Sequence, residues 1–276
     1  MKERSLKDLF HLVRQVLPEE QQLVTVKTGT TVQEALNTMK RGGFSQLPVV
    51  EGSEVLGVFS YRSLSQGLSR LPSRIQDSKA ANILVLPVED FIEKLRFAHV
   101  HDELAALLDE FDVNDAILVG TQEHLLGMIS TIDALKYFYS VASPYVLLRE
   151  IELAIRELIR ASVDEPILRM CCDISLRAHY EGQNRQPPAQ LLDMSFNDYV
   201  ILLRYRETWI RFSEVFGQNQ DMAAAKLAPL PSLRNDVFHF RRELTVAEYD
   251  TLRDSRDWLL RRIRMVEAKR AGSSGA

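Results

Sequence analysis

The sequence predicts an α+β domain made of two β-α-β-β-α units, followed by an all-α helical bundle domain. An internal repeat predicts the first part, because the order of segments between residues 23 and 68 recurs, more loosely, between residues 97 and 137. Gly57 and Gly127, which are 70 positions apart, mark the same point of each copy. A change of periodicity predicts the second part, because apolar residues after residue 142 recur at the helical spacing of about 3.6.

The composition is that of a globular chain of about two domains. Of the 276 residues, 46% are apolar and 26% are charged, which excludes the disordered and fibrous classes. No apolar run reaches the roughly 18 residues of a membrane span, and the charged start lacks the apolar stretch of a signal peptide. We therefore expect a cytoplasmic protein with no membrane partner. The adjacent Cys171 and Cys172 cannot by themselves form a disulfide framework or a metal site, and we expect both to be buried.

Each copy of the repeat contains its own helix and strand signals. In the first copy, the pattern predicts an extended stretch, a helix, two strands and a short helix at residues 23–26, 31–43, 45–50, 55–60 and from 61 onward. Val32, Leu36 and Met39 share one face of the first helix. In the second copy, it predicts a helix, two strands and a helix at residues 102–113, 116–119, 125–130 and 131–140. Asp102 is the predicted N-cap of the first of these helices.

The two ends of the chain carry weaker signals. Residues 1–16 read as an amphipathic helix, whose apolar face consists of Leu6, Leu9, Phe10 and Val13 and continues to Leu17. We expect this helix to pack on the repeat or on a partner subunit, because its polar face is not strongly basic. The last residues, 271–276, are predicted to be a flexible tail.

The strand and helix motifs of the repeat, LPVV followed by GVFSYRS and AILV followed by GMISTID, resemble the tandem CBS (cystathionine beta-synthase) domain pair. The resemblance covers about residues 17–141. In the second copy, a strand ends at Ser130 and a helix begins at Thr131, so hydroxyls and free amide N–H groups converge where a phosphate can bind. The resemblance implies that Ser130 and Thr131 contact the phosphate, and Asp133 the ribose, of ATP, ADP or AMP.

The first copy departs from this pattern. Ser60 and Arg62 stand where a phosphate could be held, but Ser63 stands where the ribose-binding carboxylate would be. We therefore expect one competent nucleotide site in the pair. The alternative interpretation of Asp133 is an acidic residue that only complements the dipole at the start of its helix.

The second domain, residues 143–270, is predicted to contain only helices. Ser143 and Pro144 read as the N-cap and first turn of its first helix, after a break at residues 142–144. Further helices are predicted at about residues 166–180, over a long stretch at 196–217, at about 231–242, and after a capping box formed by Thr245 and Glu248. Of the 20 basic residues after position 142, 18 are Arg, the side chain that grips phosphate with two parallel hydrogen bonds.

The candidate chemistry of this domain lies in the predicted helix at 231–242, for which Ser232 is the expected N-cap. Arg234 would then lie in the first helical turn, while Asn235 and His239 are four apart and share a face. An imidazole that transfers protons beside a guanidinium that stabilises negative charge is a minimal set for cleaving RNA through its own 2′-hydroxyl.

The pattern R-N-x3-H at the start of a helix in a small helical domain resembles the HEPN superfamily (higher eukaryotes and prokaryotes nucleotide-binding). The resemblance implies a metal-independent endoribonuclease of a toxin or defence system, with Arg234, Asn235 and His239 as catalytic residues, RNA as substrate, and a homodimer whose active centre draws on both protomers. No metal or cofactor is expected to take part in catalysis. HEPN members that receive adenylyl groups carry a Tyr two residues after the His, and Arg241 at that position counts against this variant.

Two non-catalytic alternatives remain open at this stage. In the first, the protein is a nucleotide sensor whose helical domain binds RNA or another protein, so His239 can pack in a core. In the second, the helical domain serves only for dimerisation, and Arg234 is held in salt bridges.

Overall fold

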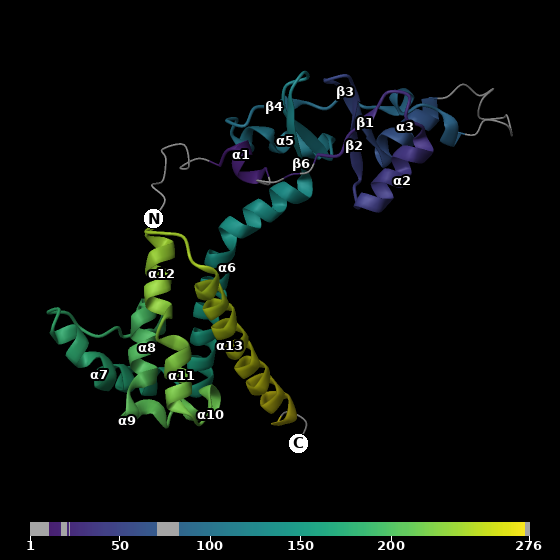
Figure 1. Cartoon of the computed structure of the whole chain (residues 1–276). Helices are drawn as coiled ribbons and strands as arrows, with labels where there is room; N and C mark the ends of the chain where they lie inside the picture. Colours follow the sequence, from purple (N-terminus) through teal and green to yellow (C-terminus); the bar gives the residue numbers. More distant parts are fainter. Residues whose placement is uncertain (1–10, 18–20, 22, 71–82, 274–276) are drawn as a thin grey trace. The chain divides into compact units, whose positions relative to one another are not determined.

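The computed structural model describes residues 11–17, 21, 23–70 and 83–273 (Figure 1). The chain divides into two compact units, Met1–Tyr139 and Ser140–Ala276. This boundary lies close to the predicted change of periodicity at residue 142. Most of the residues predicted to form the N-terminal amphipathic helix lie outside the described part, which begins at His11.

The first unit contains two three-stranded sheets with the strand orders β1-β2-β3 and β4-β5-β6. Their strands are β1 Val26–Lys27, β2 Gln46–Glu51, β3 Glu54–Ser60, β4 Phe97–Ala98, β5 Ala116–Gly120 and β6 Leu125–Ser130. In each sheet the first pair is parallel and the second antiparallel. The register repeats as well, since Pro48 pairs with Val58 and Leu118 pairs with Met128. The internal repeat read from the sequence is therefore a repeat in the structure.

Helices cover both sheets, with α2 and α3 beside the first and α1 and α5 beside the second (Figure 1). Their bounds are α1 Val13–Val16, α2 Val32–Gly42, α3 Tyr61–Arg70 and α5 Leu108–Val113. Short 3-10 turns lie at Ile83–Val85, Val88–Phe91 and Leu104–Leu107. The N-terminus of α2 is closed by a capping box between Thr31 and Glu34, and its C-terminus by Gly43 at φ +66°.

The start of the helical segment in the second copy differs from the prediction. The segment begins with the 3-10 turn at Leu104, and its N-cap, Glu103, makes no side-chain capping bond. The Asp102 carboxylate instead accepts the N–H of His99 at 2.8 Å. Asp102 therefore closes the turn before the helical segment, and the prediction that it is the N-cap is wrong.

The two copies share a hydrophobic cluster in addition to the one that each has of its own. The shared cluster joins β3, β5 and the segment before β4 through buried side chains of Val55, Val58, Leu95, Ala116 and Leu118. Since the face of one sheet is buried against residues of the other copy, neither copy closes its core alone.

Each sheet is also crossed by a segment from outside its own β-α-β-β-α unit, at equivalent positions. In the first copy, the backbone of Glu93 exchanges hydrogen bonds with the backbone of Val58 at 2.8 and 2.9 Å. In the second copy, the side-chain amide of Gln21 takes this role, because it donates to the Met128 carbonyl at 2.8 Å and accepts the Met128 N–H at 3.0 Å. A single amide group thus satisfies the edge that a backbone segment satisfies in the first copy.

The second unit is largely helical, and its first helix begins within the first unit. Helix α6 runs without interruption over Thr131–Ser162, with Pro144 inside it. A proline has no N–H to donate to the carbonyl four residues earlier, that of Ser140. This carbonyl accepts hydrogen bonds from the hydroxyl of Ser143 at 3.2 Å and from that of Tyr249 at 3.3 Å. The predicted break at residues 142–144, with Ser143 as an N-cap, is therefore wrong.

The remaining helices pack around one hydrophobic cluster. They are α7 Glu165–Glu181, α8 Phe196–Arg204, α9 Arg206–Trp209, α10 Ser213–Phe216, α11 Gln220–Leu227, α12 Leu230–Phe238 and α13 Val246–Ser273. Buried members of the cluster include Ile155, Cys171, Tyr199, Leu230 and Leu252. The long helix predicted at 196–217 is in fact three short helices, because the chain turns at Tyr205 and again at Ile210 to Phe212.

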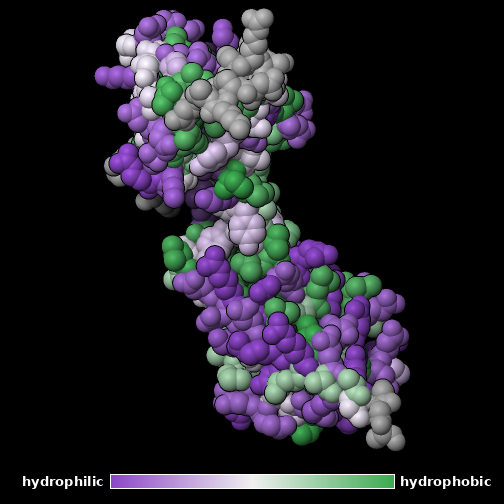
Figure 2. Space-filling view, turned by 90° about the vertical axis from the view of Figure 1, so that its right-hand side faces the viewer, coloured by the Kyte–Doolittle hydropathy of each residue, from purple (hydrophilic) through white to green (hydrophobic). Residues whose placement is uncertain are grey.

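Helix α13 begins after the predicted capping box of Thr245 and Glu248, whose two backbone-to-side-chain bonds measure 2.8 and 3.3 Å. It reaches Ser273 and so takes in three residues of the predicted flexible tail, of which residues 274–276 lie outside the described part. The face of the second unit that carries α13 is mostly hydrophilic (Figure 2). In the described part of the chain, no helix is both long and apolar enough to cross a membrane.

The crossing segments explain why glycine stands at the equivalent positions 57 and 127. A Cβ on Gly57 would lie 2.7 Å from the Glu93 carbonyl oxygen, whereas a Cβ on Gly127 would lie 2.5 Å from the side-chain ends of Gln21 and Leu17. We expect Gly57→Ala to lower the free energy of unfolding by about 2 kcal/mol, because backbone must move, and Gly127→Ala to lower it by only about 1 kcal/mol.

Urea denaturation followed by circular dichroism checks this order. Gly272→Ala is the control, because a Cβ there meets no atom within 4 Å. Equal losses for Gly57→Ala and Gly127→Ala would contradict the different roles of the two crossing segments.

Candidate functional site

The predicted nucleotide site of the second copy lies where β6 ends and α6 begins. The Asp133 carboxylate accepts the N–H of Ser130 at 2.9 Å and its hydroxyl at 2.6 Å, and the Asp133 N–H donates to the Ser130 hydroxyl at 3.2 Å. All three bonds to the carboxylate and hydroxyl close the start of the helix. Thr131 is exposed beside them, and its N–H donates to the Asp115 carbonyl at 3.2 Å. The structure thus brings the three predicted residues together at one helix start.

Asp133 uses one carboxylate oxygen, Oδ2, for both of these bonds. Among the described residues, its other oxygen, Oδ1, has no hydrogen-bond partner within the chain. The side chain is half-buried rather than enclosed. The capping role that was the alternative interpretation of Asp133 is therefore real, but it leaves one oxygen for a ligand.

The first copy has the same cap with different chemistry. Ser63, which is 70 positions before Asp133, exchanges hydrogen bonds with Ser60: the Ser60 N–H donates to the Ser63 hydroxyl at 2.8 Å and the Ser63 N–H to the Ser60 hydroxyl at 2.9 Å. The Ser60 hydroxyl donates to Glu93 at 2.9 Å, and Arg62 lies 3.9 Å from the other oxygen of that carboxylate. The two residues predicted to hold a phosphate thus hold a carboxylate of the chain itself. Glu93 is a functional residue that the sequence analysis missed, because nothing in the sequence links it to Ser60.

The candidate catalytic residues lie on α12, at a different depth in the helix from that predicted. The helix begins at Leu230 with Pro229 as its N-cap, so Ser232 is its third residue and not its cap. Arg234 is therefore the fifth residue, beyond the first turn, and His239 is the C-cap. The predicted proximity of Arg234 to the helix N-terminus is wrong, because the chain enters the helix two residues earlier than Ser232.

Arg234 and Asn235 contact one another, since an Arg234 nitrogen donates to the Asn235 Oδ1 at 3.2 Å. The Arg234 guanidinium lies 4.8 Å from the centre of the Phe238 ring, in a cation–π contact. Among the described residues no acidic group forms an ion pair with Arg234. His239 is exposed. Two expectations of the non-catalytic alternatives, a salt-bridged Arg234 and a His239 packed in a core, are therefore not met.

The turn after α12 is held by its backbone and by a group of charges. The N–H of Arg241 donates to the Asp236 carbonyl at 2.9 Å, and that of Phe240 to the Val237 carbonyl at 3.2 Å, which is a Schellman motif. Arg242 lies 2.7 Å from the Asp236 carboxylate and donates to both oxygens of Glu248 at 2.7 Å each. The end of α12 is thereby tied to the start of α13.

Aromatic side chains around His239 form the feature of this site that the sequence analysis missed. Phe238 and Phe240 are exposed, and the ring of Tyr145 lies edge-on to that of Phe238 at 5.5 Å. The Tyr145 hydroxyl donates to the Val237 carbonyl at 3.4 Å. The run Phe238-His239-Phe240 was readable as a signal, but the alternation does not by itself tell an exposed pair from a buried one.

Other predicted absences and null assignments can be compared with the structure. Cys171 and Cys172 are buried, and desolvation raises the pKa of the Cys172 thiol to about 12. Within the described ranges there is no cluster of three or more His, Cys, Asp or Glu side chains that could hold a metal ion. His11 lies 2.7 Å from the Tyr137 hydroxyl.

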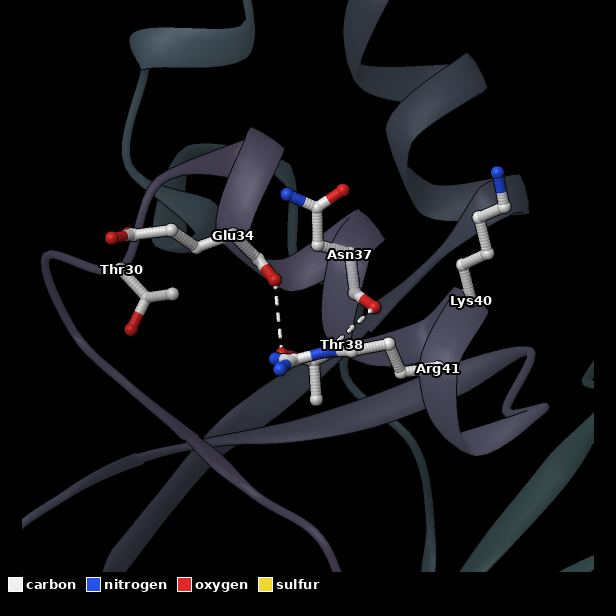
Figure 3. Close-up of a pocket in the computed structure, with 6 residues that line it drawn as sticks. All are labelled: Thr30, Glu34, Asn37, Thr38, Lys40 and Arg41. Atoms are coloured by element: carbon white, nitrogen blue, oxygen red, sulfur yellow. Dashed lines mark hydrogen bonds between the residues drawn. The ribbon is translucent and has the colours of Figure 1, made fainter.

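A surface cavity of about 590 Å³ lies elsewhere in the first unit, along α2 (Figure 3). Several of its polar groups bond to their own helix, since Thr38 donates to the Glu34 carbonyl at 3.0 Å and Arg41 to the Asn37 carbonyl at 3.4 Å. A second cavity of about 400 Å³ is lined by Arg204, Arg206, Gln220, Asp221 and three alanines. Neither cavity includes a predicted site residue.

The strand pairs, the repeated helix-start caps and the motif at Ser60 lead to the comparison with known proteins. Residues 13–70 match the CBS domain family. This region holds the first copy up to the end of α3, while the second copy is related to it by the repeated strand pairing described above. A search of the curated proteins found no match.

Three solved CBS-domain structures illustrate the likeness. The CBS-domain protein ATU1752 of Agrobacterium tumefaciens is 21% identical, with 45% of this chain and 97% of that one covered at a TM-score of 0.38. Protein MJ1225 of Methanocaldococcus jannaschii is 22% identical, with 48% and 50% covered at 0.41. The CBS domain pair of protein MJ0100, in complex with 5′-methylthioadenosine and S-adenosyl-L-methionine, is 13% identical, with 47% and 96% covered at 0.38.

The Arg242–Glu248 pair has a testable electrostatic consequence. Hydrogen bonds from Arg242, and then from the Thr245 backbone, lower the pKa of Glu248 from 4.5 to about 2. A lowered pKa in the folded state means that the carboxylate stabilises the fold fully above about pH 4.5 and that this stabilisation is lost as the pH falls toward 2. Because the pair is largely exposed, we expect Glu248→Gln to lower the free energy of unfolding by only about 1 kcal/mol at pH 7.

Denaturation of both proteins between pH 7 and pH 3 measures this, and the difference between them should shrink as the pH falls. Asp250→Asn, on the same helix and in an exposed pair with Arg253 at 3.6 Å, is the control and should change little. A difference that stays constant over this pH range would rule out the ionised Glu248 as its source.

Proposed function

We propose that the first unit senses an adenine nucleotide and that the second unit is a metal-independent, HEPN-type endoribonuclease whose rate responds to that nucleotide. The observation that carries the enzymatic part is the end of α12, where an exposed His239 follows an Arg234 that has no acidic partner among the described residues. Basic and proton-transferring groups that are not committed to structural ion pairs are available to a substrate.

The proposed nucleotide site is the helix start at Ser130, Thr131 and Asp133. Exposed amide and hydroxyl groups at the start of α6 can receive phosphate oxygens, and Asp133 Oδ1 can accept a ribose hydroxyl. The first copy supports a single site per pair, because Glu93 already supplies the negative charge beside Ser60 and Arg62. Whether the ligand is ATP, ADP or AMP depends on the number of phosphates that this helix start accepts.

In the proposed reaction, the 2′-oxygen of a ribose attacks the adjacent phosphorus while the 5′-oxygen of the next nucleotide leaves. His239 takes the proton of the 2′-hydroxyl or returns one to the leaving oxygen, and Arg234 stabilises the negative charge that builds up on the phosphoryl oxygens. Asn235 orients Arg234 through their hydrogen bond of 3.2 Å. We propose a homodimer, in which the second protomer supplies the group that completes the acid and base pair.

Asp133 tests the nucleotide site. Asp133→Ser copies the cap that Ser63 forms in the first copy, so it removes the carboxylate while it retains the capping hydroxyl. We expect this variant to bind the favoured adenine nucleotide about 10 to 100 times more weakly, as expected when a polar partner is left unpaired, with little loss of stability. Isothermal titration calorimetry with ATP, ADP and AMP measures this.

Asp133→Ala should weaken binding similarly and also lose the cap. The response of cleavage to nucleotide should disappear in both variants while the basal rate remains. Unchanged nucleotide affinity in both would exclude Asp133 as a ligand contact.

His239 tests the enzyme. We expect His239→Ala to slow RNA cleavage by at least about 100-fold, the usual contribution of an acid or base catalyst, without a change in stability because the side chain is exposed. Arg234→Ala should do the same. Cleavage of total RNA by the purified protein measures this, and the products should carry 2′,3′-cyclic phosphate ends and form in the presence of EDTA.

His179→Ala is the matched control, since His179 is an exposed histidine of the same unit. A wild-type protein that leaves RNA intact with and without adenine nucleotides would contradict the enzymatic proposal. The nucleotide sensor with a non-catalytic helical unit would then be the better description.

A further inference from the structure

Exposed aromatic rings surround the candidate catalytic histidine at the end of α12. Phe238 is 42% exposed and Phe240 is 73% exposed, and they stand on either side of His239 in the chain. Phe238 is held between Tyr145, edge-on at 5.5 Å, and Arg234, whose guanidinium lies 4.8 Å from the ring centre. In the described part of the molecule, the one ring contact of Phe240 is a tilted one with Tyr145 at 6.4 Å.

The backbone at Phe240 is unfavourable for a phenylalanine. Its φ is +53°, in the left-handed region that only glycine adopts without cost. Phe240 occupies the position of the Schellman motif where glycine is the usual residue, as the bonds from Phe240 to Val237 and from Arg241 to Asp236 show. Glycine at this position would therefore close α12 with less strain.

Stability does not account for the phenylalanine either. A ring that remains 73% exposed gains little free energy from burial when the chain folds. A strained residue that contributes little to the core is instead typical of a position with a binding role. The ring is thus better explained by something outside the chain that it contacts.

The surroundings indicate the chemistry of that contact. Arg234 and the 63% exposed Arg241 add positive charge around the rings, and His239 is exposed between them. Rings with adjacent arginines are what single-stranded nucleic acids require, since bases stack on the rings while phosphates meet the cations. An apolar protein partner would gain from the rings but would have to desolvate the arginines.

We infer that Phe240, with Phe238 beside it, is a base-stacking subsite for single-stranded RNA, which holds the nucleotide next to the phosphodiester that His239 and Arg234 attack. This inference rests on the proposed function for its substrate, but it concerns binding and not cleavage. It makes the end of α12 selective for unpaired regions of RNA, because a paired base has no free face to offer.

The test compares the binding of two short, fluorescein-labelled single-stranded oligoribonucleotides to the full-length protein. One carries bases of mixed sequence and the other is abasic at its central positions, and both carry 2′-O-methyl groups so that they cannot be cleaved. The wild type should bind the oligonucleotide with bases more tightly. In Phe240→Gly this preference should fall by about 5-fold to 150-fold, the effect of one base stacked on an aromatic ring.

A second measurement separates this role from a structural one. Because glycine relieves the left-handed backbone, Phe240→Gly should have a higher melting temperature than the wild type while it binds RNA more weakly. Phe240→Trp should retain the preference for bases. Ile210→Ala is the matched control, since Ile210 is 74% exposed in the same unit but carries no ring, and it should bind both oligonucleotides like the wild type.

The outcomes distinguish the inference from the proposed function. Binding that depends on Phe240 in a protein that does not cleave RNA would support the subsite and refute the ribonuclease. Cleavage by wild type and Phe240→Gly with equal kcat/KM and equal preference for bases would overturn the subsite and leave the ribonuclease standing. A change of oligomeric state in Phe240→Gly, measured by light scattering, with RNA affinity unchanged would overturn it in favour of a second copy of the chain.

Discussion

The carbonyl of Ser140 is the point on which the continuity of the chain depends. Pro144 removes the N–H that would bond to it, and this usually ends or kinks a helix. The hydroxyls of Ser143 and Tyr249 replace that N–H, so α6 continues over its full 32 residues. The bond from Tyr249 comes from α13 and so depends on tertiary structure. A helix that begins at the proposed nucleotide contact thus extends to Tyr145, which packs on Phe238 in the second unit.

The repeat of the first unit combines one geometry with two chemistries. Both β3 and β6 end in a serine that caps the next helix together with the side chain three residues later. In the first copy that partner is Ser63, and the nearby positive charge of Arg62 faces Glu93. In the second copy the partner is Asp133, which keeps one oxygen unbonded. Duplication followed by these exchanges leaves the fold unchanged, because both caps satisfy the same backbone groups, and it makes the two copies unequal toward a ligand.

At the end of α12 several requirements meet in a few residues. The turn needs a left-handed residue, the link to α13 needs Arg242 between two carboxylates, and the proposed chemistry needs an exposed imidazole. Glycine at position 240 would serve the first of these better than phenylalanine. Proteins accept local strain of this kind at positions where a side chain acts on a ligand.

Local patterns of the sequence were sufficient for much of the fold. The repeat, its strands, the α2 helix and the Thr245–Glu248 cap were all predictable, because each depends on residues close together in the chain. So was the convergence of Ser130, Thr131 and Asp133, which are neighbours at one helix start. The catalytic role of Arg234, Asn235 and His239 and the binding of a nucleotide stay predictions.

Tertiary contacts decided the rest. Sequence rules favour a helix break at Pro144 because they cannot include a hydroxyl that arrives from Tyr249, more than 100 positions away. They cannot place the Glu93 carboxylate on Ser60, or tell that Phe240 stays exposed in a left-handed backbone. The start of α12 and the division of residues 196–217 into three helices likewise depend on packing against other helices. Local propensity ranks the options at each position, and the long-range contacts that satisfy or bury each group select among them.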